Sequence, residues 1–127
     1  MKDQLIRFET AKLAKEKGFN EPCNNAFDLK IYQPSNLFEE NIEEISNVDE
    51  YSNSEYERFN RPTQSLLQRW LRDEKFIDVF VINSIKENCY DWEIREEENI
   101  VLECDQYFHN YEAALEDALK EALKSLI

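Results

Sequence analysis

The sequence predicts an α+β fold in which an antiparallel β-meander of three to four strands is covered by two or three helices. Two patterns lead to this prediction. Residues 111–127 carry apolar side chains at helical spacing, with charged residues on the opposite face. Residues 77–108 alternate in short runs between apolar and polar side chains, as strands do. Strands joined by short turns pair antiparallel, and flanking helices cover one face of the sheet. The predicted order is α-β-(insertion)-α-β-β-β-α.

The first half of the chain opens with a predicted helix at 9–17. Gly18 ends this helix, because glycine readily adopts the left-handed conformation that a helix C-terminus favours, and Phe19 follows as the hydrophobic contact. A half-buried strand is predicted at 26–33, where apolar and polar residues alternate up to Pro34.

An acidic insertion is predicted at about 35–60, within a single domain that spans 1–127. The stretch from Ile31 to Glu57 has acidic residues but no lysine or arginine. Apolar residues at i, i+4 and i+7 favour a short amphipathic helix over 38–45. The Asn- and Ser-rich stretch 46–54 is typical of a mobile loop.

The second half of the chain begins with a predicted helix, because Pro62 suits a first helical turn and an apolar stripe that includes Trp70 follows. The predicted strands are 77–85, 91–96 and 100–108. The first of these is apolar on both faces, which predicts an interior strand. The last helix begins near Asn110, a favourable N-cap. The predicted core consists of Leu66, Leu67, Trp70, Leu71, Val79, Val81, Trp92, Ile94, Leu102, Leu115, Leu119 and Leu123.

Residues 62–127 have the α-β-β-β-α order of double-stranded-RNA-binding domains, and the similarity stops there. Those domains place lysines at the start of their last helix, where this chain has Glu112, Glu116 and Asp117. Carboxylates repel phosphates, so the sequence does not favour RNA binding by this route.

Three segments together resemble a family of small uncharacterised proteins found in Bacteroidetes genomes and prophage-like regions. The segments are 8–19, 62–72 and 111–116. The resemblance implies a compact α+β domain and is consistent with a mobile-element origin. It brings no established activity and therefore no functional residues. The acidic insertion is where this chain departs from the family.

Charge limits the partners that the chain is expected to bind. The formal net charge is −13, with 28 acidic and 15 basic residues. Such a surface repels nucleic acids and anionic lipids and favours basic proteins, so we expect a protein partner, no nucleic acid and no membrane. No apolar run is long enough for a signal peptide or a membrane span, which predicts a cytoplasmic protein.

The sequence assigns no catalytic, cofactor-binding or metal-binding residue. His109 is the only histidine, and Cys23, Cys89 and Cys104 are too widely spaced for a zinc site, so three reduced thiols are expected. Asp91 with Glu93, and Glu103 with Asp105, invite a metal-dependent hydrolase hypothesis. However, no lysine or histidine follows to assist the chemistry, and solvated acidic faces explain such pairs equally well.

The favoured function is a non-enzymatic intracellular accessory protein, or protein-interaction module, of phage-like origin. The candidate binding surfaces are the acidic segment and one uncovered sheet face. The candidate partner-binding residues are Phe38, Glu39, Glu40, Glu43, Glu44, Tyr51 and Tyr56. Two alternatives stay open: an acidic DNA mimic or inhibitor, and an unrecognised metal-dependent hydrolase.

Overall fold

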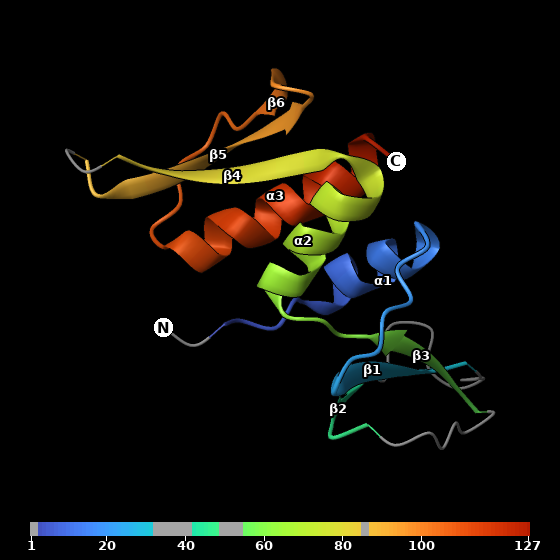
Figure 1. Ribbon diagram of the computed structural model, residues 1–127. Helices are drawn as coiled ribbons and strands as arrows, with labels where there is room; N and C mark the ends of the chain where they lie inside the picture. The colour runs from blue at the N-terminus through green and yellow to red at the C-terminus, as the bar shows by residue number, and fades with distance from the viewer. Residues whose placement is uncertain (1–2, 32–41, 49–54, 85–86) are drawn as a thin grey trace.

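The computed structural model describes residues 3–31, 42–48, 55–84 and 87–127. It has three helices and two antiparallel three-stranded sheets, which confirms the predicted α+β class. Figure 1 shows the helices lying between the two sheets. The additional sheet is the main departure from the predicted arrangement.

The N-terminal sheet has the strand order β2-β1-β3, with β1 at its centre. Its strands and the preceding helix are α1 (Phe8–Glu16), β1 (Asn25–Lys30), β2 (Ile42–Ser46) and β3 (Tyr56–Asn60). The sheet packs on α1 by aromatic contacts: the ring of Phe8 meets Phe27 edge-on at 5.5 Å and Phe59 at 5.3 Å between centroids. These contacts bury the inward face of the sheet.

The prediction of a helix over 38–45 is wrong for residues 42–45, which the structure describes, because residues 42–46 form strand β2. The strand pairs antiparallel with β1, so that Ile42 lies opposite Leu29 and Ile45 opposite Ala26. Backbone groups at an open sheet edge are satisfied by a neighbouring strand, and this tertiary pairing overrides a short helical pattern. The remainder of the expected helix, and residues 49–54 of the expected loop, lie outside the described residues.

The C-terminal sheet has the order β4-β5-β6 and is the predicted meander. The elements of this half are α2 (Gln64–Lys75), β4 (Ile77–Ser84), β5 (Cys89–Glu96), β6 (Asn99–Glu103) and α3 (Tyr111–Ser125). Strand β6 ends earlier than the predicted 100–108, and Phe108 then forms a separate bridge to Tyr90 on β5. The β5–β6 hairpin turns at Glu97 and Glu98, both with positive φ.

Two helix ends follow the predicted chemistry, at Asn110 and Gly18. The side chain of Asn110 accepts a hydrogen bond from the Ala113 N–H at 2.7 Å. Helix α2 begins later than predicted: Thr63 is its N-cap and accepts from Leu66 N at 3.2 Å, so Pro62 precedes the helix. Gly18 follows α1 with φ of +99°, a left-handed conformation that other residues rarely adopt, although a Cβ at this position would meet no neighbouring atom. These caps fix where α1 ends and where α2 and α3 begin.

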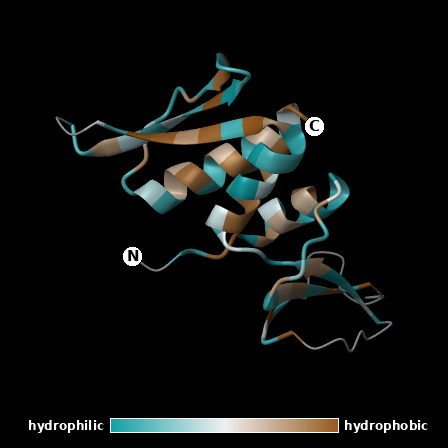
Figure 2. Ribbon diagram, viewed as in Figure 1, coloured by the Kyte–Doolittle hydropathy of each residue, from teal (hydrophilic) through white to brown (hydrophobic). Residues whose placement is uncertain are grey.

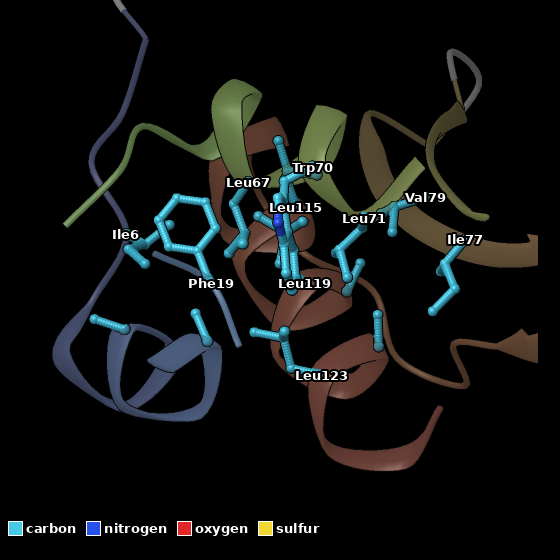
Figure 3. Close-up of a cluster of buried hydrophobic side chains, with 14 of the residues drawn as sticks. Ile6, Phe19, Leu67, Trp70, Leu71, Ile77, Val79, Leu115, Leu119 and Leu123 are labelled. Carbon is cyan, nitrogen blue, oxygen red and sulfur yellow. The ribbon is translucent and has the colours of Figure 1, made fainter. Parts of the chain in front are cut away.

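The hydrophobic core joins the helices to both sheets. Figure 3 shows the part of this core that lies between the helices and β4. Nine of the predicted core residues are buried: Leu67, Trp70, Leu71, Val79, Trp92, Ile94, Leu115, Leu119 and Leu123. Leu66, Val81 and Leu102 are half-buried and pack against them. The core also takes in Ile6, Phe19, Phe27 and Phe59 from the N-terminal half.

Candidate partner-binding surfaces

The acidic candidate residues that the structure describes lie on the N-terminal sheet. Glu43 on β2 and Tyr56 on β3 share one face, and the Glu43 carboxylate hydrogen-bonds the phenol. The Glu43 charge is the largest of the causes that raise the pKa of Tyr56. Phe38, Glu39, Glu40 and Tyr51 lie outside the described residues.

Glu44 lies on the opposite face of β2 from Glu43, where it forms an ion pair within the chain. Its carboxylate is 3.1 Å from Arg61 Nη1. The same guanidinium donates to the Ile6 carbonyl at 2.7 Å and lies 4.3 Å from the centroid of Phe27. Arg61 therefore links the N-terminal segment to the sheet, a role that the sequence pattern did not reveal.

A second ion pair lies on the side of this sheet that faces away from α1. Arg58 on β3 binds both carboxylate oxygens of Asp28 on β1, at 2.8 and 2.9 Å. Such a forked pair holds the two strands in register. Alternation placed Asp28 on the polar face, and the structure shows that this face is partly covered, because Asp28 is buried.

The C-terminal sheet has one covered and one uncovered face. Helices α2 and α3 pack on the face that carries Val79, Trp92 and Ile94, and Figure 1 shows no helix on the other side. We call that other side the outer face. It carries the following described residues: Asp78, Phe80, Ile82, Asp91, Glu93, Arg95, Ile100 and Glu103.

Three apolar side chains of the outer face remain in contact with solvent. Phe80 is 42% exposed, Ile82 43% and Ile100 46%. The prediction that 77–85 is an interior strand is therefore wrong, since β4 is an edge strand with only one covered face. Strand β4 does carry apolar side chains on both faces, but nothing in the described chain covers the second face.

The charge of the outer face is predominantly negative. Four carboxylates stand against the single guanidinium of Arg95, which pairs with Glu93 and lies 5.1 Å from the Phe80 centroid. Two shielded atoms of this face, Asp91 Oδ1 and Arg95 Nε, have no hydrogen-bond partner. Asp91 and Glu93 do share a face, as their spacing predicted.

A buried polar cluster joins the three helices beside a cleft of about 320 Å³. Glu116 on α3 accepts hydrogen bonds from the Arg7 N–H at 3.0 Å, from the Thr10 hydroxyl, and from Gln64 Nε2 at 3.2 Å. Arg7 occupies the N-cap of α1 and its side chain provides no cap. The Glu116 carboxylate therefore accepts the N–H of the α1 N-cap residue from another helix, and places its negative charge at the end of α1 where it is favourable.

The cysteines and the histidine do not come together. Cys23, Cys89 and Cys104 are free thiols, and His109 is exposed. Burial is the main cause that raises the pKa of all three thiols, to about 11 for Cys23. Within the described ranges, no group of three or more His, Cys, Asp and Glu side chains is arranged to hold a metal ion.

We expect all three thiols to alkylate slowly at neutral pH in the folded protein. A raised pKa keeps a thiol protonated, and only the thiolate is the nucleophile. For Cys23 the rate should climb with pH until about 11, where its thiolate becomes the major form. Iodoacetamide labelling followed by peptide mass spectrometry measures each site, with denatured protein as the control. Fast labelling of folded Cys23 at neutral pH would contradict this assignment.

Comparison with known proteins adds no relative: no family model, curated protein or solved structure matches the chain. Each helix that the structure describes is too short or too polar to traverse a bilayer.

Proposed function

We propose that this chain is a non-enzymatic protein-interaction module whose main binding surface is the outer face of the C-terminal sheet. The observation that carries the proposal is the exposure of Phe80, Ile82 and Ile100 among carboxylates on a rigid strand scaffold. Phe80 and Ile82 are neighbours on β4, and the charged side chains of β5 lie between them and Ile100 on β6. Exposed apolar side chains beside charged ones are typical of binding surfaces. Phe80 is the natural anchor, because aromatic residues contribute most to interface energies.

Charge supports a basic partner. The outer face carries four carboxylates and one guanidinium, and the whole chain has a net charge of −13. Opposite charge accelerates encounter and makes it sensitive to salt, while apolar contact supplies area that charge does not. Glu43 and Tyr56 share a face of the N-terminal sheet, which provides a second candidate surface with an acidic side chain.

An accessory role in the cytoplasm fits the three free thiols, which persist in a reducing compartment. The mobile-element origin belongs to the same proposal and rests on the family resemblance alone. A DNA mimic is the competing function, because it too would present carboxylates on strands to a basic partner.

The test compares affinity capture from the native host by the wild type and by a Phe80→Ser/Ile100→Ser variant. We expect the wild type to retain a basic protein that elutes with salt, and the variant to lose it while keeping the wild-type melting temperature within a few degrees. A Glu43→Gln/Tyr56→Phe variant measures the contribution of the N-terminal sheet. Deleting the acidic segment is unsuitable, because β2 lies within it.

Equal capture of the same partners by wild type and the outer-face variant would refute the assigned surface. If the captured protein binds DNA and added duplex DNA displaces this chain, the DNA-mimic function replaces the proposed one. Displacement by salt but not by DNA supports the interaction module.

A further inference from the structure

The edge of β4 that does not pair with β5 carries backbone N–H and C=O groups that point away from the sheet. The carbonyl of Trp92 accepts from Cys104 N at 3.0 Å, so the backbone groups of Trp92 point away from β4. Trp92 lies opposite Val81, and in an antiparallel pair such a position leaves the groups of Val81 pointing outward as well. Tyr90 exchanges both of its backbone hydrogen bonds with Phe108, so its backbone groups also point away from β4. Asn83 lies opposite Tyr90, and its N–H and C=O therefore point to the free edge as those of Val81 do.

Gln68 confirms this assignment and shows where the edge is protected. Its side-chain Nε2 donates to the Val79 carbonyl at 2.8 Å, which requires that carbonyl to face the free edge. Helix α2 thus satisfies the beginning of the edge. From Val81 to Asn83, no strand of the described chain pairs with the edge of β4 that faces away from β5.

The sequence of this edge lacks the features by which proteins prevent edge pairing. Exposed edge strands usually carry a lysine, a proline, a bulge or an inward charge. Residues 79–84 contain no charged residue and no proline, and β4 pairs with β5 without a register shift. Figure 2 shows most of β4 in the hydrophobic colour. Strand β4 therefore lies at the edge of its sheet but has the composition of an interior strand.

We propose that β4 pairs antiparallel with β4 of a second copy of this chain, about a two-fold axis that passes beside Ile82. In this register Val81 of each copy lies opposite Asn83 of the other, and each such pair exchanges both edge-facing backbone hydrogen bonds. Ile82 meets its own symmetry mate on the outer face, and Phe80 meets Ser84. The protected Val79 carbonyl keeps its bond to Gln68.

The absence of charge along residues 79–84 favours a second copy of this chain as the partner of the β4 edge. At −13, two copies repel one another over most of their surface, and residues 79–84 are a stretch where neither copy presents a charge. A basic strand would find no carboxylate among residues 79–84, and Asp91, which lies opposite Ile82, belongs to β5 and not to the edge strand. The stretch 79–84 is instead apolar and complementary to itself, as a two-fold interface requires.

This dimer goes beyond the proposed function and changes its geometry. The two C-terminal sheets become one continuous sheet, and their outer faces join across Ile82. The surface offered to a basic partner is then doubled, with both copies of Phe80 near its centre.

The test measures mass by sedimentation equilibrium from micromolar to millimolar protein, together with amide exchange. We expect a species of twice 15.3 kDa at high concentration, with protected amides at Val81 and Asn83. Asn83→Pro removes an edge-facing N–H without removing a bond to β5, and Ile82→Lys places like charges opposite each other. Both should return the mass to that of the monomer and expose the two amides.

Ile100→Lys is the matched control, since it makes the same change on the same face at similar exposure but on β6. It should leave the dimer intact. Wild-type protein that stays at 15.3 kDa throughout overturns the proposal, as does a dimer that Ile100→Lys dissociates and Asn83→Pro does not. A monomer that still captures a basic partner leaves the proposed function standing, so the two failures are distinguishable.

Discussion

Replacing Trp70 with alanine should lower the free energy of unfolding by about 3–5 kcal/mol. Its indole is buried where α2 meets the N-terminal half and contacts Phe19 edge-on, with 5.3 Å between centroids. The substitution would leave a cavity that the surrounding helices fill only in part. Denaturant unfolding with linear extrapolation measures the change.

Phe76→Ala provides the control for Trp70, because Phe76 follows the same helix and is 74% exposed. This control should change stability by less than about 0.5 kcal/mol. A loss below about 1 kcal/mol for Trp70→Ala would show that the indole does not contribute to the core as its burial indicates.

Replacing Glu116 with alanine should cost about 2–4 kcal/mol. The carboxylate is 9% exposed and accepts from the Arg7 backbone, the Thr10 hydroxyl and the Gln64 amide. Truncation leaves these donors without an acceptor, and water entering the adjacent cleft offsets only part of that loss. Thermal and denaturant unfolding of the variant provide the measurement.

A double-mutant cycle with Thr10→Ala isolates the hydrogen bond from the rest of the effect. We expect a coupling energy above about 0.5 kcal/mol, since directly bonded residues are not additive. Glu121→Ala removes the same charge from α3 and serves as the control. Equal losses for Glu116→Ala and Glu121→Ala would mean that the buried cluster contributes nothing specific.

The C-terminal half was predictable because each element carries a strong local signal. The Trp70 stripe, the alternation of β4 and β5, and the Asn110 cap each specify their element without help from distant residues. The predicted core residues are those on the apolar face of each element, and the three that are only half-buried pack at the margin of the core.

The N-terminal sheet was not predictable, because its formation depends on pairing between distant segments. The acidic segment fitted a helical spacing, and only the open edge of β1 makes a strand of residues 42–46. The ion pairs of Arg58 with Asp28 and of Arg61 with Glu44 follow from that pairing. None of them has a signature in the local sequence.

Glu116 and β4 show two further limits of local patterns. Helical periodicity placed Glu116 on the solvated face, whereas the capping requirement of α1 holds it inside. The available signal was Arg7, a poor N-cap residue at a helix start. For β4, apolar residues on both faces predict burial on both sides, but they do not say whether the same chain supplies it.

The bond between Arg7 and Glu116 joins positions that are 109 residues apart. During synthesis on the ribosome, α1 emerges long before the carboxylate that completes its first turn. The β4-β5-β6 meander pairs strands that follow one another in the sequence, and such local pairs form quickly, whereas the N-cap N–H of α1 must wait for α3. We therefore expect α1 and the N-terminal sheet to assemble last, on a C-terminal half that is already formed.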